Sequence, residues 1–359
     1  MTRPVIVVEN DPFPRLLQAF LAEKDDPERS AAIQDFVAHD IPDYPAWLAA
    51  ARAGAPGLWP AQVRLASNSE ELRAALPGAH AVVTESLTLG ETELALAKDL
   101  KVVHKYGTVL RNIDVNAVAA RGLKLLTVRR RANVGCAEYA MALMLMLAKR
   151  LHETPNLLSM EQLRNAGFKP AHFDKRYSAN SNWVRVGGMS NVLGDTLGII
   201  GLGEIGREVA VRAHAFGMKI LYTQRTRWSA AVEREFHAEY RPMEALLAES
   251  DWVMPTLPLT PDSRHILDAT RLRQMKRGAR IVNISRAEIV EREALHEALA
   301  SGQVGGLGLD TFYEEPGSAD DPLLKFSNVI ITLRIAAQPR FNAMGDLAQV
   351  MAQLAAALK

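Results

Sequence analysis

Three glycines stand at the point where an apolar run passes into a helical segment. Residues 197–200 are apolar, which predicts a buried strand. The sequence Gly-Leu-Gly-Glu-Ile-Gly follows at 201–206, and residues 207–216 have the periodicity of a helix. A G-x-G-x-x-G motif between a strand and a helix is typical of a dinucleotide-binding turn, so this segment predicts a nucleotide cofactor site.

Each glycine of this motif has a separate expected role. Gly201 permits the tight turn, Gly203 lets the backbone approach a pyrophosphate, and Gly206 lets the helix pack closely on the strand. The N–H groups at the start of the helix would then face the phosphate oxygens. The residues expected to contact the cofactor here are Gly201, Gly203, Glu204, Ile205 and Gly206.

The end of the next predicted strand, residues 219–222, selects between the two nicotinamide cofactors. NAD sites usually place Asp or Glu about 20 residues after the glycines, where it binds the ribose 2′-hydroxyl. Gln224 stands at that position and is followed by Arg225 and Arg227. An acid would repel a 2′-phosphate, whereas a guanidinium can pair with it. The sequence therefore favours NADP(H), with NAD(H) still open, and a solvated loop is the simpler interpretation of both arginines.

Two series of alternating strands and helices must position these residues. Such β-α-β alternation implies parallel sheets, so we expect an α/β fold of two doubly wound lobes, Rossmann- or flavodoxin-like, with a cleft between them. The expected domains are a substrate-binding, catalytic domain of residues 1–130 with 334–359, and a dinucleotide-binding Rossmann domain of residues 131–333. Residues 152–188 read as a surface connection. Strands are expected at 4–8, 63–66, 81–84, 101–104, 197–200, 219–222, 252–255, 280–284, 306–309 and 329–332.

Composition excludes several classes of protein. The 359 residues carry a formal net charge of +1, so nothing global indicates a nucleic-acid or membrane partner. The single Cys136 fits a reducing compartment, and the first residues predict no signal peptide, so we expect a cytoplasmic protein. The longest apolar run, 140–148, is shorter than the roughly 20 residues that cross a bilayer. The histidines are scattered, and no metal is expected.

Several long segments, in order, resemble one enzyme family. From residue 100 to 338 the chain is similar to the D-isomer-specific 2-hydroxyacid dehydrogenases, whereas the region before about residue 63 matches only in general layout, and 25–57 looks like an insertion. The segments are CAEYAMALMLMLAKR (136–150), LGDTLGIIGLGEIGREVAVRAHAFGMKIL (193–221), LPLTPDSRHIL (257–267), MKRGARIVNISRAEIVEREALHEAL (275–299) and LGLDTFYEEP (307–316).

The resemblance implies hydride transfer between the nicotinamide cofactor and a small 2-oxo or 2-hydroxy acid. Arg286 matches the arginine that holds the 2-oxo group, and it follows a predicted strand at the edge where such folds bind ligands. Glu315 matches the glutamate that orients a catalytic histidine, because it directly precedes a proline; Glu314 is an adjacent competitor. Further cofactor contacts are implied at Leu257, Pro258, Ile284, Ser285 and Asp310.

The histidine itself is replaced. The family reads T-P-H-I after its last strand, whereas this chain has Leu333 and Arg334 at the proline and histidine positions. Arginine stays protonated in proteins, so it cannot deliver a proton near neutral pH. Arg334 could instead pair with Glu315 and hold the lobes together. Three outcomes follow: a slow or inactive enzyme that only binds or senses the cofactor; a proton from His104, Lys105 or water; or an anionic substrate group bound by Arg334.

The expected substrate loop also departs from the family. Lys105, Tyr106, Gly107, Thr108 and Val109 match the loop whose N–H groups bind the substrate carboxylate, and Val109 replaces a glycine. Basic residues at 111 and 129–131 would add positive charge, which favours a di-anionic substrate; an exposed charge run is the simpler interpretation. The resemblance also implies a homodimer, with the apolar helix at 141–147 near the contact.

Overall fold

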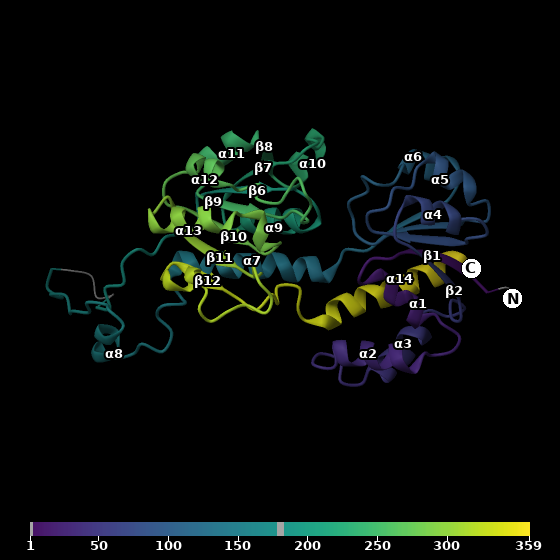
Figure 1. The fold of residues 1–359 in the computed structure, drawn as a ribbon, viewed down its shortest axis with the longest axis horizontal. Coiled ribbons are helices and arrows are strands. Elements are labelled where there is room, and N and C mark those ends of the chain that lie inside the picture. Colours follow the sequence, from purple (N-terminus) through teal and green to yellow (C-terminus); the bar gives the residue numbers. More distant parts are fainter. Residues whose placement is uncertain (1–2, 178–182) are drawn as a thin grey trace. The chain divides into compact units, whose positions relative to one another are not determined.

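The computed structural model describes residues 3–177 and 183–359 and divides the chain into two compact units. The first unit is Met1–Gly135 with Ala337–Lys359, and the second is Cys136–Ala336 (Figure 1). The expected boundaries at 130 and 333 fall within a few residues of these. Within the described residues no helix is long and apolar enough to cross a membrane.

The first unit contains a parallel sheet of five strands in the order β2-β1-β3-β4-β5. Along β1, Ile6 and Val8 join the core on one face of the sheet and Val7 joins the core on the other, as alternating side chains of a strand buried on both faces must. The strands are β1 (Val5–Glu9), β2 (Gln62–Ala66), β3 (Ala81–Thr84), β4 (Val102–Lys105) and β5 (Lys124–Thr127).

Helices cover both faces of this sheet. The C-terminal helix α14 packs on β4 and α3, and its Met344, Leu347 and Met351 are buried in the same core as Ile6 and Val8. Leu72 of α4 and Leu94 of α5 belong to the core on the opposite face. The helices are η1 (Pro14–Leu16), α1 (Leu17–Phe20), α2 (Pro27–Val37), α3 (Tyr44–Ala53), α4 (Ser69–Ala75), α5 (Glu91–Leu96), α6 (Val115–Ala120) and α14 (Arg340–Leu358).

The second unit contains a parallel sheet of seven strands in the order β12-β11-β10-β9-β6-β7-β8. The strand order reverses between β6 and β9, and open α/β sheets bind ligands at the carboxyl ends beside such a point. The strands are β6 (Thr196–Ile200), β7 (Lys219–Thr223), β8 (Ala238–Tyr240), β9 (Trp252–Pro255), β10 (Ala279–Asn283), β11 (Val304–Leu309) and β12 (Val329–Ile331).

The helices of the second unit follow the expected alternation. The long α7 (Arg131–Lys149) begins in the first unit and continues into the second. The others are α8 (Met160–Asn165), α9 (Glu204–Ala215), α10 (Ala230–Glu235), α11 (Met243–Glu249), α12 (Ala269–Gln274), η2 (Ala287–Ile289), α13 (Arg292–Ala300) and η3 (Pro322–Lys325).

Two parallel sheets with flanking helices confirm the predicted fold class. The strands missed by the pattern, β5 and β8, are short edge strands of four and three residues, too short for a clear alternation. Helix α2 lies in the stretch that looked like a polar insertion, and α8 lies in the expected surface connection, whose residues 178–182 are outside the described ones.

Candidate active site

The glycine-rich turn lies at the carboxyl end of β6, beside the reversal of strand order. Gly201 has a φ of +102°, which disfavours any residue with a Cβ. A Cβ on Gly206 would lie 2.4 Å from the carbonyl oxygen of Gly201, so α9 can begin this close to the turn only with glycine here. A Cβ on Gly203 would meet no atom within 4 Å. The open side of Gly203 and the N-terminus of α9 therefore fit a pyrophosphate.

Gln224, at the end of β7, is bound to this turn. Its Oε1 accepts a hydrogen bond from the N–H of Leu202 at 3.2 Å, and its Nε2 donates to the carbonyl of Thr226 at 2.6 Å. A neutral side chain thus stands where an acid would bind a ribose hydroxyl, and it brings no negative charge toward a 2′-phosphate.

The two candidate phosphate-binding arginines differ in their surroundings. Arg227 is held by Glu233, with its Nε 2.8 Å from one carboxylate oxygen, and this pairing lowers the pKa of Glu233. The Tyr222 hydroxyl donates to the same carboxylate at 2.8 Å, and burial together with this bond raises the pKa of Tyr222 to about 12. Arg225 is 93% exposed, with Asp262 at 3.8 Å. Arg225 is therefore the guanidinium better able to reorient toward a ligand.

Sequence reasoning missed an aromatic support beside the turn. The Trp228 Nε1–H donates to the carbonyl of Leu202 at 2.9 Å, so the indole is fixed against the glycine-rich segment. The guanidinium of Arg207 lies over the rings of Trp228 and Phe236, at 4.2 and 4.9 Å. The tryptophan directly after the Arg225–Arg227 segment was the available signal.

Loops after β9 and β10 contain most of the other expected cofactor contacts. The Leu257 side chain is next to Gly201, where an added Cβ would lie 2.7 Å from it. The Pro258 carbonyl accepts a hydrogen bond from Ser263 at 2.7 Å. The Ser285 hydroxyl donates to the carbonyl of Pro255 at 2.9 Å, which ties the two loops together, and Ile284 is buried. These residues therefore lie at neighbouring strand ends.

Arg286 follows β10, and its side chain is exposed. The loop before it is set by Asn283, which is fully buried and which the sequence analysis did not single out. The Asn283 Nδ2 donates to the carbonyl of Arg286 at 2.8 Å, and its Oδ1 accepts from the N–H of Ser285 at 2.9 Å. One Arg286 nitrogen donates to the carbonyl of Ser285 at 2.7 Å. Asn283 therefore positions a guanidinium that stays accessible to a ligand.

Arg334 and Glu315 form an ion pair, with 43% and 56% of their side chains exposed. Both residues belong to the second unit, so the pair joins two loops of that unit, and the expectation that it holds the lobes together was wrong. Arg334 has a φ of +58°, an uncommon conformation for arginine. Glu314 pairs instead with Arg292, at 3.3 Å. The two adjacent glutamates thus have different cationic partners.

Asp310, expected as a cofactor contact, is buried at the end of β11. Its carboxylate accepts hydrogen bonds from the Thr332 hydroxyl at 2.7 Å and from the N–H groups of Ile335 and Ala336 at 3.1 and 2.7 Å. These bonds shape the loop on which Arg334 lies. In this structure, Asp310 therefore positions the Arg334 loop.

The expected substrate loop belongs to the first unit. Lys105 is buried at the end of β4, where its ammonium donates to the carbonyl of Glu85 and to the Asn112 side chain. Tyr106 is buried, with the Arg130 guanidinium over its ring at 5.3 Å, and burial raises the pKa of its hydroxyl. Gly107 has a φ of +146°, Thr108 is exposed and Val109 is half-buried. Of these five residues, Thr108 is the most accessible.

His104, considered as a substitute proton donor, and the basic residues Arg130 and Arg131 all have partners within the first unit. His104 is fully buried, bonds Gln353 of α14 at 2.8 Å, and has a pKa lowered by burial, which is the environment of a core histidine. Arg130 pairs with Glu85 at 3.2 Å and Arg131 with Asp346 at 3.2 Å. Within the first unit, Glu85 and Asp346 therefore offset part of the positive charge expected near the substrate loop at 105–109.

Glu9, at the end of β1, is a positioning residue that the sequence did not reveal. Its buried carboxylate accepts from the N–H groups of Glu85, Ser86 and Leu87 at 2.6, 2.8 and 3.0 Å, and from the hydroxyls of Thr84 and Ser86. Burial alone would raise the pKa of Glu9, but these hydrogen bonds outweigh it, so the pKa lies below its usual value. Glu9 thus fixes the segment to which Lys105 and Arg130 bind.

The apolar run of α7 has one buried side, while Ala142 is exposed. Met141, Leu143, Met144 and Leu147 are buried within the chain itself. Leu143 and Leu147 pack where β11 has glycines, and a Cβ on Gly308 would lie 3.1 Å from Leu143. The buried side of α7 therefore packs on the sheet of the second unit, and a subunit contact near residues 141–147 stays a prediction.

Together the turn and the reversal of strand order define a dinucleotide-binding protein of the doubly wound α/β class. Comparison with known proteins gives the family. The sequence model described as "D-isomer specific 2-hydroxyacid dehydrogenase, NAD binding domain" matches residues 141–336. The chain therefore belongs to the D-isomer specific 2-hydroxyacid dehydrogenase family.

Relatives agree with this assignment over most of the chain. A glyoxylate reductase of Korarchaeum cryptofilum is 36% identical over 263 residues, covering 73% of this chain and 74% of its own. A hydroxypyruvate reductase of Thermotoga maritima is 34% identical, covering 75% and 81%. Among solved structures, D-mandelate dehydrogenase of Rhodotorula graminis has a TM-score of 0.57 at 20% identity, covering 98% and 93%, which is a likeness of fold.

Proposed function

We propose that this chain is an NADP(H)-linked reductase of small 2-oxo acids, with glyoxylate and hydroxypyruvate as its first candidate substrates. The observation that carries the proposal is the placement of an accessible Arg286 at the same sheet edge as the glycine-rich turn. Relatives named for these two substrates, at 36% and 34% identity, support the substrate class.

Bound on the turn at 201–206, the cofactor would supply the hydride. Arg286 then holds the 2-oxo oxygen and stabilises the negative charge that develops there as the carbonyl carbon accepts the hydride. Its planar guanidinium can bind the oxo oxygen and a carboxylate oxygen of the same substrate. The Asn283 bonds keep the loop in place, so little reorganisation is needed when the substrate binds.

The proton must come from a group other than Arg334. His104 and Lys105 are buried and bonded within the first unit. The Arg334–Glu315 pair is open to solvent, so we assign the proton to a water molecule beside it, with hydroxide leaving to bulk solvent. Arg334 then acts as a fixed positive charge that stabilises the alkoxide until the proton arrives.

The same fixed charge supports a finer substrate proposal. A second anionic group on the substrate could pair with Arg334, whose charge Glu315 offsets only in part at an exposed site. We therefore expect a 2-oxo dicarboxylate such as oxaloacetate to compete with glyoxylate. The homodimer implied by the family also remains a prediction.

One specific observation favours an alternative function, a cofactor-binding homologue with little turnover. Arg334 both replaces the proton donor and occupies Glu315, the residue that would have oriented a histidine. Such a protein would bind NADPH through the intact turn and reduce no 2-oxo acid.

Steady-state kinetics separate the two functions. The wild type and the Arg286→Gln variant are assayed in parallel for oxidation of NADPH and NADH. The substrates are glyoxylate, hydroxypyruvate and oxaloacetate. We expect measurable turnover with NADPH and a fall in kcat/KM of about 100-fold to 1,000-fold for R286Q, as for loss of a group that stabilises an oxyanion. NADPH affinity should be unchanged in R286Q. Tight NADPH binding without turnover on any of the three acids would favour the alternative.

A further inference from the structure

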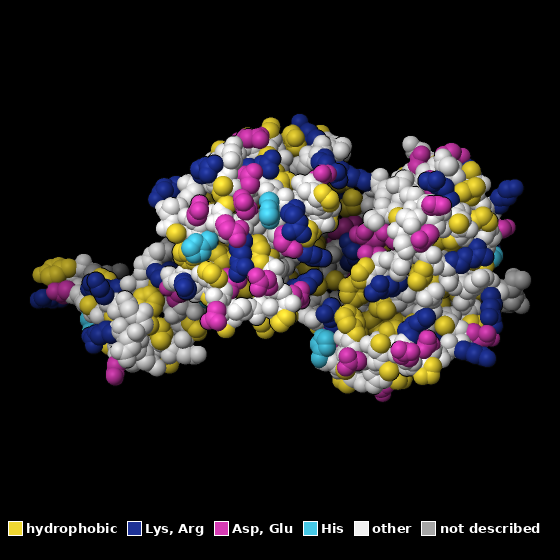
Figure 2. Space-filling model, viewed as in Figure 1, with side chains coloured by type: hydrophobic (Ala, Val, Ile, Leu, Met, Phe, Trp, Pro, Cys, Tyr) yellow, Lys and Arg dark blue, Asp and Glu magenta, His cyan; other side chains and the backbone are white. Residues whose placement is uncertain are grey.

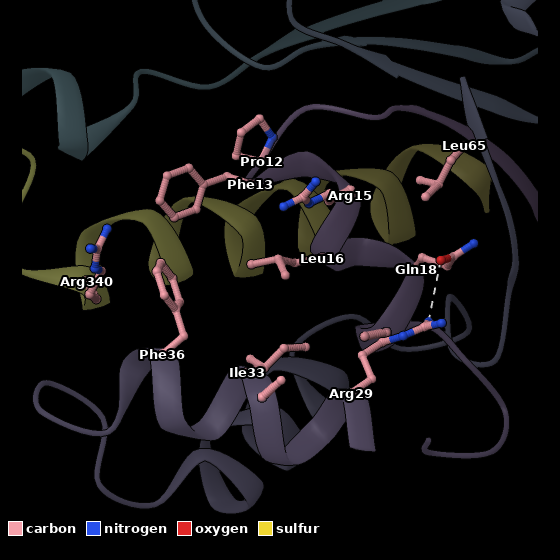
Figure 3. A pocket seen from close by; sticks show the side chains of 12 residues that line it. Pro12, Phe13, Arg15, Leu16, Gln18, Arg29, Ile33, Phe36, Leu65 and Arg340 are labelled. Atoms are coloured by element: carbon pink, nitrogen blue, oxygen red, sulfur yellow. Dashed lines mark hydrogen bonds between the residues drawn. The ribbon is translucent and has the colours of Figure 1, made fainter. Parts of the chain in front are cut away.

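A pocket of about 560 Å³ lies within the first unit, and no residue assigned to the cofactor or the substrate lines it. Its walls come from the segment after β1, from α1, from α2 and from the start of α14. Figure 3 shows Phe13 and Leu16 on one side, Ile33 and Phe36 on the other, and Arg340 beside Phe36. The volume is within the range of small-molecule sites, about 300 to 1,000 Å³.

Helix α2 is the part of the chain that makes this pocket possible. It lies in residues 25–57, the stretch that looked like an insertion. Asp26 caps it by accepting from the N–H groups of Glu28 and Arg29 at 3.0 and 3.2 Å, so the helix is well defined locally. Arg29, Ala32, Ile33 and Phe36 of this helix line the pocket. The cavity is therefore a consequence of the insertion.

The charged side chains that line the pocket are all arginines, with Asp26 and Asp40 close to its edge. Three arginines, Arg15, Arg29 and Arg340, are among the lining residues, and no Asp or Glu is. Arg29 donates a hydrogen bond to the Gln18 side chain at 3.4 Å (Figure 3), and its guanidinium lies 4.0 Å from the carboxylate of Asp26. Among residues 3–177 and 183–359, neither Arg15 nor Arg340 forms an ion pair with an acidic side chain. In the space-filling view, dark-blue side chains lie among a yellow surface over this part of the first unit (Figure 2).

Arg340 in particular has an unused donor. Its Nε–H is buried and has no hydrogen-bond acceptor within the described part of the chain. Its guanidinium lies 4.4 Å from the centre of the Phe36 ring. Burial lowers the pKa of Arg340, and Asp40 opposes that effect only in part. A buried donor without a partner costs free energy, which an incoming oxygen atom would recover.

We propose that this pocket binds a small amphipathic carboxylate, one with an aromatic or branched apolar body and a single acid group. The apolar body lies against Phe13, Leu16, Ile33 and Phe36, and the carboxylate pairs with Arg340 at the end of the pocket beside Phe36 (Figure 3). A purely apolar ligand would leave the guanidinium groups unpaired, and a small hydrophilic anion would leave the apolar walls in water. The site is independent of the proposed dehydrogenase function.

Calorimetry with one matched pair of probes tests the charge requirement. 4-Phenylbutyrate and its uncharged amide are titrated into the full-length protein. We expect saturable binding of the carboxylate with a Kd below about 1 mM. The amide should bind at least about tenfold more weakly, because a charge-assisted bond is lost. Equal binding of both probes, or no saturable binding of the carboxylate, would overturn the proposal.

Variants locate the site. Arg340→Met keeps an unbranched apolar side chain and should weaken 4-phenylbutyrate binding about fivefold or more, whereas Arg15→Met should weaken it less. Ala32→Trp should fill the cavity and abolish binding without loss of Tm, because Ala32 is exposed on α2. Arg121→Met is the matched control: this arginine pairs with Glu91, does not line the pocket, and should leave binding unchanged.

Two results would contradict this assignment. Wild-type affinity in R340M would place any bound carboxylate elsewhere. A self-association that A32W abolishes and that 4-phenylbutyrate does not affect, measured by sedimentation velocity, would make this surface an interface between copies of the chain.

Discussion

The glycine-rich turn and the Arg334 loop belong to the same unit and follow strands of the same sheet. We expect the turn to bind its ligand through backbone groups, and the fold itself requires glycine at 201 and 206, while Gly203 leaves open space. The loop has Arg334 where the family resemblance implies a proton-donating histidine, and the bonds of Asp310 to Thr332, Ile335 and Ala336 fix its backbone. The difference teaches that cofactor binding can persist with the backbone while the acid–base chemistry changes by a single substitution.

The largest expected effect is in the turn. Gly206→Val would place a Cβ 2.4 Å from the Gly201 carbonyl, so α9 must move, and NADPH binding should become undetectable with a clear loss of Tm. Nucleotide fluorescence and thermal unfolding measure both effects.

Gly203→Ala is the matched control for that change. Its Cβ meets no protein atom within 4 Å, so the protein should keep its Tm and still lose affinity for NADPH, because the methyl group enters the space needed by the pyrophosphate. Unchanged NADPH affinity in G203A would mean that the dinucleotide lies elsewhere.

A smaller change, and a gain, is expected in the Arg334 loop. Arg334→His combined with Leu333→Pro would place an imidazole beside Glu315 and supply a group that titrates near neutral pH. We expect kcat/KM for 2-oxo acid reduction to rise about 10-fold to 100-fold and to fall as the pH rises through the histidine pKa. The wild type should show no such step between pH 5 and 8, because Arg334 stays charged.

The pH profile makes this prediction specific. Leu333→Pro alone is the control for backbone effects, since Leu333 is 75% exposed. Lower turnover in the double variant than in L333P would show that Arg334 serves its own chemistry, such as binding a second anionic group.

The smallest effect is expected in cofactor choice. Arg225→Gln should reduce the preference for NADPH over NADH by about tenfold, the loss expected from one exposed guanidinium–phosphate contact. Arg227→Gln should change it less, because Glu233 already binds that guanidinium. The ratio of kcat/KM for the two cofactors measures both. A larger effect in R227Q than in R225Q would mean that Arg227 is the arginine that binds the 2′-phosphate.

The sequence predicted the elements that residues close together in the chain determine. Residues 197–216 contain the strand, the turn and the helix in one segment, and the structure has all three as predicted. The contacts of Asn283 are local, to Ser285 and Arg286, but the apolar run before them gives no sign of them. The contacts of Asp310 and Glu9 could not be predicted, because each depends on where a segment distant in the sequence comes to lie. What covers the apolar run of α7 could not be predicted for the same reason, since only the structure shows that Leu143 and Leu147 pack on β11.

The pocket beside α2 shows the same limit. Capping by Asp26 can be read from the sequence, but the approach of Phe36 to Arg340, more than 300 residues later, cannot. The apolar runs and the chirality rule of β-α-β units are enough to predict the parallel sheets. A cavity, however, depends on how side chains of different elements pack against one another.

The most direct test of the central claim is the NADPH-dependent reduction of hydroxypyruvate, followed by chiral analysis of the product. The account predicts that one NADPH is consumed for each D-glycerate formed, and that R286Q reduces this rate by about 100-fold or more while its NADPH affinity stays that of the wild type. Formation of L-glycerate, or an R286Q variant as fast as wild type, would contradict it.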